Sequence, residues 1–378
     1  MADTLASQTS SLMETIDDLS AYMISGRVRG SSDPTSRTSG RTPAQGIQDG
    51  VEAELIGFRR IFVSERWNLK ESAVLLGAVG SRTCRIELAT GLFNASARNP
   101  LHAAAFGSTM HAAFGPRFVM GLGRGDRYNL EMVGLRESTF AGLRDYVRII
   151  HRLWRGETVS YDGPAGSYPL LALGDVHEGP NPKIWFGTFG LPRAAEVIAD
   201  CMDGVLLVPN LTPDGTAAAV QRIRSACERI GRDPTTVRIA QCVVTAPELD
   251  ELETLEICHA RALTYLQTPS WGEALCTING WSHETLAKIR NHPQLVALDT
   301  IADNVYHRSE LVAPARGIPE SWMKASCAIG TVSECVAQLK SFRDAGADEI
   351  VTYGSTPAQN AAVAAAWRAE AHCGHPSA

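Results

Sequence analysis

The stretch FVMGLGRGDRYN, residues 118–129, joins three alternate glycines to a carboxylate, a guanidinium and an amide. Glycine-rich turns after a buried strand cradle phosphate in dinucleotide-binding domains. That cradle needs its third glycine one residue later and runs directly into a helix of the first strand–helix unit. Here Asp126 takes that position, and the next expected helix, over 137–154, begins well downstream. The spacing favours the rim of a different site, and the alternative is a turn that its polar residues only cap and solvate.

Small and polar residues also end other apolar runs that we expect to be strands. The run 59–65 leads into Arg66. The run 85–93 contains Thr90 and Gly91, and the run 182–190 ends with Gly187-Thr188-Phe189-Gly190. The ends of parallel strands share one rim, which is where barrel enzymes keep their chemistry. The run 182–190 precedes a helix whose first N–H groups are free and suit an anion. Arg193, in the first turn of this helix, either adds positive charge for that anion or is simply an exposed side chain.

An alternation of strands and helices positions these residues. Eight apolar runs are expected strands, each with a helical pattern after it: 19–24, 59–65, 85–93, 117–123, 182–190, 204–210, 237–246 and 348–354. Most are continuously apolar, as expected of strands buried on both faces of a parallel sheet. This α/β pattern predicts a (β/α)8 TIM barrel, and a doubly wound sheet is the alternative fold.

The predicted domain organisation is a disordered segment 1–18 followed by one barrel domain, 19–372. A small β-insertion is expected at 156–181, after the fourth helix. A longer insertion, 268–325, precedes the last unit and has no clear strand pattern. Both occupy positions from which they could cover the barrel mouth. Segment 268–325 could equally serve packing or contact between two copies, so a homodimer is compatible with the sequence.

Composition excludes several classes of function. The net charge is −6 without a dense Lys/Arg block, which makes nucleic acid and membrane surfaces poor partners. No apolar run approaches the roughly 20 residues of a membrane helix, and the first 18 residues lack the pattern of a secretory signal. Nine scattered cysteines without a Cys-x-x-Cys spacing indicate reduced thiols, no metal site and a cytoplasmic protein.

The segments in this order resemble the luciferase-like monooxygenase superfamily, over about residues 19–370. The motifs that carry the resemblance are FVSERWNLKES, RIELATGLFNASARNP, RFVMGLGRGDRYN, FAGLRDYVRIIHRLWRGETVSYDG, PKIWFGTFGLPRAAEVIADCMDGVLL and IGTVSECVAQLKSFRDAGADEIVTYG. The Ser-Glu-Arg-aromatic and Gly-x-Gly-x-Gly-acid patterns are most similar to the branch that uses the deazaflavin coenzyme F420. This implies an oxidoreductase that moves hydride between F420 and a small alcohol, carbonyl or unsaturated compound held under 268–325. The alternatives are an FMN-dependent monooxygenase and a non-catalytic flavin or F420 carrier.

The resemblance also implies roles for individual residues. Glu65, Arg66 and Asp126 would be catalytic, and Thr90-Gly91 would hold a cis peptide behind the ring. The other cofactor contacts would be Asn129, Gly187, Thr188, Phe189, Gly190 and Arg193. The chain departs from several F420-dependent dehydrogenases, which have a proton-accepting histidine where Arg66 stands. Since an arginine is no base, Glu65 or Asp126 would take the proton, or the reaction would need a cation to polarise a carbonyl or to hold a carboxylate. In the alternative interpretation, Glu65 and Arg66 only shape the rim.

Overall fold

A computed structural model describes residues 13–25, 41–66, 69–298 and 300–373, so Trp67 of the motif FVSERWNLKES lies outside the described residues. The chain divides into two units. One comprises Met1–Phe62, Pro209–Thr216 and Gln241–Ala378, and we call it the terminal unit. The other comprises Val63–Val208 and Ala217–Ala240, and we call it the central unit.

The central unit is built on parallel strands in the order β3 (Glu87–Thr90), β5 (Phe118–Gly123), β8 (Lys183–Thr188) and β9 (Gly204–Leu207), and the short β4 (Phe93–Asn94) also pairs with β5. Their middles are buried because the runs are apolar, as in Ile184-Trp185-Phe186 of β8. The longer helices of this unit are α3 (Ser72–Gly80), α4 (Pro100–Phe114), α6 (Phe140–Trp154), α7 (Pro192–Cys201) and most of α8 (Pro213–Arg229).

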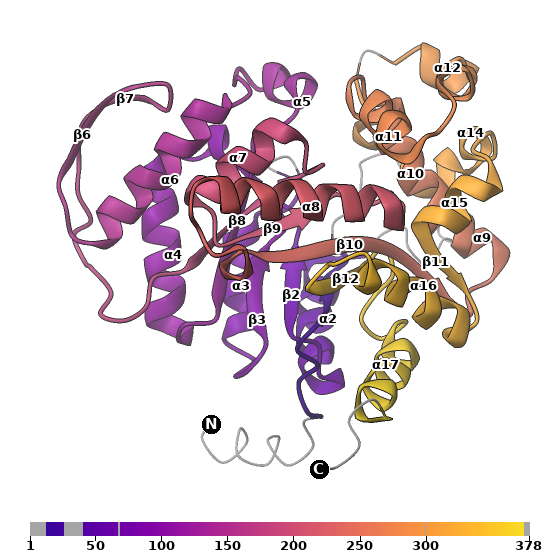
Figure 1. Cartoon of the computed structure of the whole chain (residues 1–378), viewed down its shortest axis with the longest axis horizontal. Coiled ribbons are helices and arrows are strands. Elements are labelled where there is room, and N and C mark those ends of the chain that lie inside the picture. The colour runs from indigo at the N-terminus through magenta and orange to yellow at the C-terminus, as the bar shows by residue number, and fades with distance from the viewer. Residues whose placement is uncertain (1–12, 26–40, 67–68, 299, 374–378) are drawn as a thin grey trace. The chain divides into compact units, whose positions relative to one another are not determined.

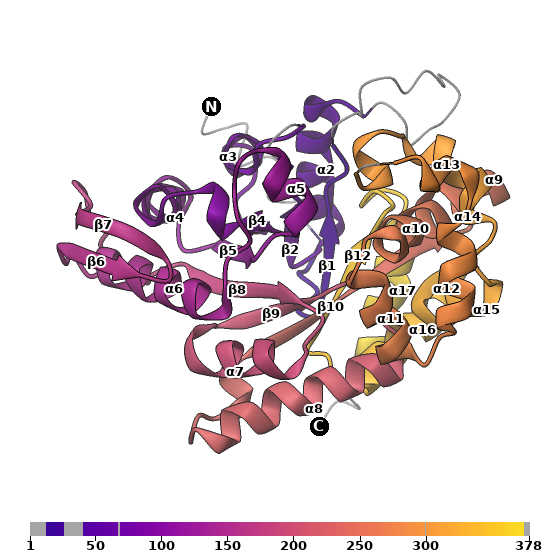
Figure 2. The same cartoon turned by 90° about the horizontal axis from the view of Figure 1, so that it is seen from above.

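Helix α6 shows why these segments are helical. Thr139 accepts a hydrogen bond from the backbone N–H of Gly142 and thereby caps the first turn. Leu143, Val147 and Ile150 recur at helical spacing and are buried. The predicted β-insertion follows it as the antiparallel hairpin β6 (Val159–Gly163) and β7 (Gly166–Leu171). The hairpin lies beside α6 (Figure 2).

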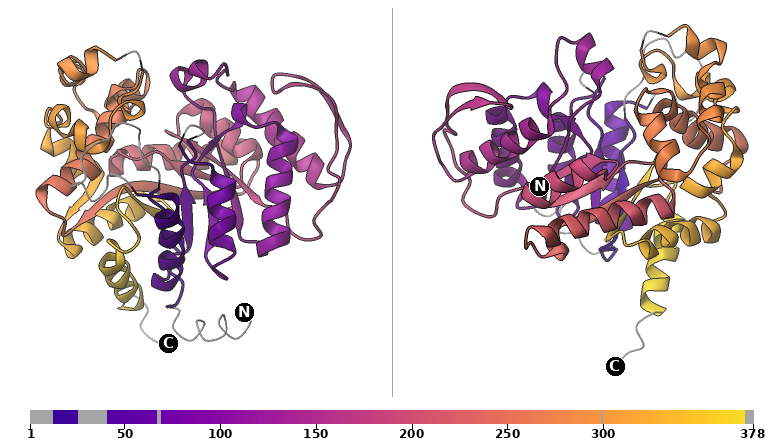
Figure 3. Two further views of the ribbon diagram at one scale, coloured as in Figure 1. Left: turned by 180° about the vertical axis from the view of Figure 1, so that it is seen from behind. Right: turned by 45° about the horizontal axis from the view of Figure 1, so that its top comes forward.

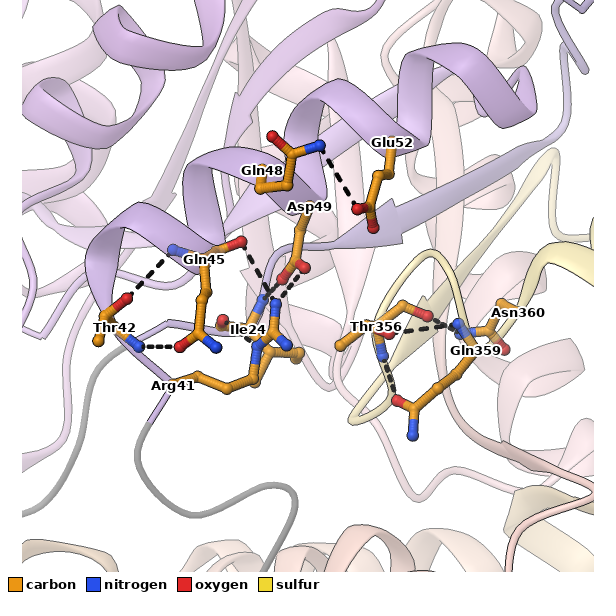
Figure 4. A network of polar contacts seen from close by, with 10 residues as sticks. All are labelled: Ile24, Arg41, Thr42, Gln45, Gln48, Asp49, Glu52, Thr356, Gln359 and Asn360. Atoms are coloured by element: carbon orange, nitrogen blue, oxygen red, sulfur yellow. Dashed lines mark hydrogen bonds and ion pairs between the residues drawn. The ribbon is translucent and has the colours of Figure 1, made fainter.

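The terminal unit has its strands in the order β11 (Cys327–Gly330), β10 (Arg238–Pro247), β12 (Glu349–Tyr353), β1 (Leu19–Tyr22) and β2 (Arg60–Val63). Before β1, Ile16 already forms a parallel bridge with Phe58, so the described structure begins ahead of the predicted start at residue 19. Helix α2 (Pro43–Ile56) begins with a capping box between Thr42 and Gln45 (Figure 4). Helices α16 (Val332–Asp344) and α17 (Ala361–Cys373) complete the last predicted unit.

Segment 268–325 is mainly helical, and Figure 3 shows its helices as an orange group. Trp281 and Trp322 stack with their ring centroids 4.6 Å apart, which ties distant parts of the segment together. Its elements are α11 (Trp271–Asn279), α12 (His283–Arg290), α13 (Pro293–Val296), the 3-10 turns Ala302–Asn304 and Arg308–Leu311, α14 (Val312–Ala315) and α15 (Glu320–Ser326).

Within the described residues, the parallel strands include the eight of a (β/α)8 barrel, which confirms the predicted fold over the doubly wound sheet (Figure 1). The prediction missed two strands and a helix: β4, β11 and α5 (Arg127–Met132). The helical pattern predicted after the run 237–246 forms α9 (Glu251–Thr254), a π-helical turn (Leu255–His259) and α10 (Ala260–Gln267). No helix in the described ranges is long and apolar enough to cross a membrane.

Candidate functional site

All the sequence-predicted site residues belong to the central unit. Thr90, at the end of β3, is completely buried. Its Oγ1 accepts a hydrogen bond from the N–H of Gly121 at 2.7 Å and donates one to the carbonyl of Gly121 at 2.8 Å. The Thr90 hydroxyl therefore links β3 to β5 at this point, where backbone hydrogen bonds would otherwise join the two strands. A Cβ at position 121 would lie 2.0 Å from the carbonyl oxygen of Thr90, so this contact requires glycine.

Leu92 is the central side chain of this site. Its methyl groups lie against the positions that side chains at Gly121, Gly123 and Gly187 would take. The space directly over these glycines, where a flat ring could otherwise lie, holds the Leu92 side chain. The cis peptide is Gly91–Leu92, one residue after the predicted Thr90–Gly91. The sequence shows the apolar run RIELATGLF but gives no sign that Leu92 turns onto three glycines.

Glu65 is held close to Leu92 and to helix α3. Its backbone N–H donates to the carbonyl of Leu92 at 3.1 Å. Its Oε2 accepts hydrogen bonds from the backbone N–H of Ser72 at 3.2 Å and from the Ser72 hydroxyl at 2.5 Å. The carboxylate also pairs with Arg98 and its side chain is only 5% exposed. Glu65 thus helps to start α3 and is fixed by its neighbours.

Arg98, which the sequence analysis did not select, connects this region. It forms ion pairs with Glu65 and with Glu71, whose carboxylate also caps α3 through the N–H of Val74. Its guanidinium carbon lies 5.1 Å from the ring centroid of Phe93. Burial opposes the charge on Arg98, but the two carboxylates more than offset this and raise the pKa of the guanidinium. Arg98 therefore stays charged and fixes the loop that carries Glu65.

Arg66 lies in a short antiparallel bridge with Lys70, and its backbone N–H donates to the Lys70 carbonyl at 3.1 Å. Trp67 and Asn68, which lie between the two bridged residues in the sequence, are outside the described residues. Arg66 follows the buried Glu65 directly in the chain.

Asp126 and Asn129 contact each other. Oδ1 of Asp126 accepts from the backbone N–H of Asn129 at 2.9 Å, and Oδ2 accepts from its side-chain amide at 2.7 Å. Asp126 is the N-cap of the unpredicted helix α5, whose first residue is Arg127. The glycine-rich run therefore does open into a helix, contrary to the sequence analysis. The spacing Asp-x-x-Asn was a capping signal that could have revealed it.

The segment 187–193 joins the end of β8 to the start of α7. Gly190 has φ 68°, and its carbonyl accepts from Arg222 at 2.8 Å. Helix α7 begins with Pro192, and the side chain of its N-cap Leu191 supplies no hydrogen bond to the first turn. The N–H groups of this turn are therefore not capped by the N-cap side chain, and the exposed Arg193 stands among them. Thr188 and Phe189 are half-buried on the approach to this turn.

The structure thus forms two groups from the predicted residues. Glu65, Thr90, Gly91 and Gly187 surround Leu92, while Asp126 and Asn129 cap α5. The side-chain amide of Asn94 lies 3.4 Å from the Cβ position of Gly123 and 3.3 Å from that of Gly125. Gly190 and Arg193 belong to the start of α7. The described part of the chain holds no group of three metal-ligating side chains, and its eight described cysteines are free.

Comparisons with known proteins agree on one family. The family model for luciferase-like monooxygenases matches residues 21–349. The chain is 29% identical over 227 residues to the F420-dependent glucose-6-phosphate dehydrogenase of Nakamurella multipartita, covering 56% of this chain and 62% of that relative. It is 26% identical over 278 residues to the phthiodiolone/phenolphthiodiolone dimycocerosates ketoreductase of Mycobacterium tuberculosis, covering 71% and 69%. The chain thus spans less than two thirds of the first relative.

Among solved structures, the chain resembles the coenzyme F420-dependent tetrahydromethanopterin reductase from Methanopyrus kandleri. The TM-score is 0.73 at 16% sequence identity, and the match covers 93% of this chain and 98% of that chain. At this identity the likeness supports the barrel fold alone. The family model matches far more than half of the sequence. The chain therefore belongs to the luciferase-like monooxygenase family.

Proposed function

We propose that the protein is a coenzyme F420-dependent oxidoreductase that transfers hydride between the deazaflavin and an organic substrate, an alcohol or carbonyl pair or an unsaturated compound. The name of the first relative supports F420. The names of both, a dehydrogenase and a ketoreductase, support a reaction at a hydroxyl or carbonyl carbon. The observation that carries the proposal is the shelf formed by Leu92 over Gly121, Gly123 and Gly187. This shelf lies in the same unit as the start of α7, where the side chain of the N-cap residue Leu191 forms no hydrogen bond with the first turn.

The residues present fit such a cofactor. Leu92 is half-buried, so part of its side chain is left to support the face of a planar tricyclic ring. Thr90 and Gly91 would act by fixing Leu92 in place. Gly187, Thr188, Phe189, Gly190 and Arg193 would hold the phosphate of the cofactor tail, through the N–H groups of the first turn of α7 and one positive charge. When bound, the deazaflavin supplies the hydride chemistry.

The polar groups of the rim would serve orientation and proton transfer. Of the two candidate carboxylates, Asp126 is the better placed for proton exchange, because Glu65 is almost fully buried and engaged by Ser72 and Arg98. Asn129 would orient Asp126 through their direct hydrogen bond. Arg66 carries a guanidinium and would act only as a cation. These three assignments are proposals about roles that the geometry permits.

A turnover assay tests the proposal. The purified protein is offered oxidised F420 with a panel of alcohols, and reduced F420 with ketones, aldehydes and enones, while the deazaflavin absorbance is followed. We expect turnover with at least one substrate class and no oxygen consumption. Substrate-dependent oxygen consumption with reduced FMN, without any turnover of F420, would contradict the proposal and identify an FMN-dependent monooxygenase.

A further inference from the structure

The carboxyl ends of helices α6 and α7, in the central unit, border an open cavity of about 580 Å³. Pockets of about 300–1,000 Å³ hold small molecules in other proteins. The described lining residues of the cavity include four arginines: Arg148, Arg152, Arg155 and Arg232. None of the lining residues was predicted for the candidate functional site. The cavity is therefore a separate candidate for ligand binding.

This cavity lies at the starting end of strand β8. Asp203 lines the cavity and accepts a hydrogen bond at 2.8 Å from the N–H of Ile184, the second residue of β8. The predicted phosphate contacts lie instead where β8 ends and α7 begins. Helix α7 has 10 residues, and at about 1.5 Å for each residue its two ends are about 15 Å apart. A ligand in the cavity would therefore not occupy the candidate cofactor site.

Arginines outnumber the carboxylates with which they pair around the cavity. Two carboxylates each pair with two arginines at 2.7–2.9 Å: Asp200 with Arg144 and Arg148, and Glu157 with Arg152 and Arg155. Each of these groups carries one positive charge more than its carboxylate neutralises. Among the described residues, Arg232 pairs with no carboxylate. Its Nη1 donates to the carbonyls of Ile198 at 3.3 Å and Ala199 at 2.9 Å, in the last turn of α7.

The overall charge around the cavity is positive. Lys183 pairs with Asp203 at 3.5 Å, and Asp145 lies 3.9 Å from Arg148. With the pairs above and Arg232, these residues comprise six cationic side chains and four carboxylates. Burial lowers the pKa of His151, which also lines the cavity and therefore stays neutral near pH 7. The ends of α6 and α7 contribute about half a negative charge each, so an excess of about one positive charge remains.

The arginines of the cavity keep hydrogen-bond donors that a ligand can use. The side chains of Arg148, Arg152 and Arg155 are 55%, 40% and 57% exposed. Arg152 donates to Glu157 through Nε, and its Nη1 and Nη2 donate to no described residue. Guanidinium groups bind phosphate oxygens through paired, charge-assisted hydrogen bonds. An oxyanion can therefore bind these donors while the carboxylates keep their present partners.

We propose that this cavity binds the diphosphate group of a small molecule, held by Arg148, Arg152 and Arg155. The excess of positive charge favours an anion, and several separate guanidinium groups favour an anion that has many oxygens and more than one charge. A single carboxylate has only two oxygens and would leave most of these donors unused. Because the cavity and the candidate cofactor site lie at opposite ends of α7, the diphosphate compound is a ligand in addition to the cofactor and its substrate.

Isothermal titration calorimetry of the full chain with inorganic diphosphate tests the proposal, at low ionic strength so that salt does not screen the charges. Arg148→Met and Arg155→Met should each weaken diphosphate binding by about tenfold, because each removes charge-assisted hydrogen bonds. Arg316→Met is the matched control. It removes the same charge from a side chain of the terminal unit that is 58% exposed, and it should leave the affinity unchanged.

Asp200→Asn tests the argument from charge in the opposite direction. It removes a carboxylate that competes for Arg144 and Arg148, so diphosphate should bind about tenfold more tightly than to the wild type. Asp17→Asn is the matched control, because it makes the same change on a side chain that is 88% exposed. A gain in affinity cannot come from a loss of structure. This variant therefore decides the question if circular dichroism shows that an arginine variant is unfolded.

Arg193→Met distinguishes the cavity from the start of α7, where a phosphate group is also expected to bind. We expect this variant to bind diphosphate as the wild type does. Loss of binding in Arg193→Met, with wild-type affinity in Arg148→Met and Arg155→Met, would place the diphosphate at the candidate cofactor site and overturn the proposal. No binding to the wild type at millimolar diphosphate would also overturn it, as would equal losses in Arg155→Met and Arg316→Met, which would indicate an effect of net charge alone.

Discussion

The side chain of Leu92 occupies the position that a side chain at Gly187 would need. A Cβ on Gly187 would lie 1.9 Å from Cδ1 of Leu92 and 2.8 Å from its Cγ. The two residues come from segments far apart in the sequence, and the glycine permits the leucine to form the shelf. This relationship makes Leu92, rather than the glycines themselves, the part of the site that would meet a cofactor ring.

Gly187→Ala should therefore displace Leu92. We expect a loss of about 1–3 kcal/mol in the free energy of unfolding, because the added methyl overpacks the contact, together with weaker cofactor binding. Combining it with Leu92→Ala should recover most of this loss relative to Leu92→Ala alone, since the clash is then gone. Urea denaturation of the four proteins measures the coupling. Strictly additive effects would show that the two side chains do not compete for the same space.

Arg98→Met should be among the most destabilising changes near the site. It leaves the Glu65 carboxylate, 5% exposed, without its cation, and breaking a buried pair from one side costs about 3–5 kcal/mol. Arg127→Met is the control, because Arg127 is 77% exposed and its pair with Glu131 should contribute less than about 1 kcal/mol. Urea denaturation compares both variants with the wild type. Equal stability of the two variants would mean that Arg98 does not hold the Glu65 loop.

Asp126→Asn separates helix capping from proton transfer. Asparagine caps about as well as aspartate, so stability should stay within about 0.5 kcal/mol, whereas Asp126→Ala should lose about 1 kcal/mol. Turnover by Asp126→Asn should fall more than its affinity for F420. If Glu65 also acts in proton transfer, Glu65→Gln should likewise lose more turnover than affinity for F420. Steady-state kinetics and cofactor titration provide the two values. Full turnover in both variants would leave the two carboxylates with structural roles only.

Asp49 on α2 should make stability depend on pH. It is 2% exposed, accepts a hydrogen bond from the N–H of Ile24 at 2.8 Å and pairs with Arg41 (Figure 4). Burial, which Arg41 only partly opposes, raises the pKa of Asp49 from 3.8 to about 6. The folded state thus favours the protonated carboxyl, so its contribution is complete below about pH 4 and is lost as the pH rises through about 6.

Relative to Asp49→Asn, the wild type should therefore lose up to about 3 kcal/mol between pH 4 and pH 7. Chemical denaturation at several pH values measures this difference. Asp17→Asn is the matched control, because the Asp17 side chain is 88% exposed. A constant difference between the wild type and Asp49→Asn over this range would show that Asp49 titrates as it does in the unfolded chain.

The sequence predicted the barrel because its strands are long apolar runs with clear helical patterns between them. The prediction failed for elements that consist of only a few residues. Helix α5 has only six residues, so it carries no periodicity, and only the Asp126 and Asn129 pair signals it. Strand β11 has four residues and follows directly on α15, which hides it in a helical region.

For the candidate site, the sequence predicts only which residues stand at strand ends. Positions such as Thr90, Gly187 and Asp126 follow from strand ends, whose order a barrel dictates. The contacts of Leu92 and Arg98 could not be predicted, because both depend on residues that meet only in the fold: Leu92 on glycines of two other strands, and Arg98 on carboxylates of the preceding loop and helix.

Titration of the purified wild-type protein with F420 and, separately, with FMN tests the central claim most directly. Fluorescence or absorbance of each cofactor gives its dissociation constant, and Gly187→Ala serves as the variant in which the Leu92 shelf is disturbed. We predict micromolar or tighter binding of F420, no binding of FMN, and a weaker F420 affinity in Gly187→Ala. Binding of FMN with none of F420 would contradict the account.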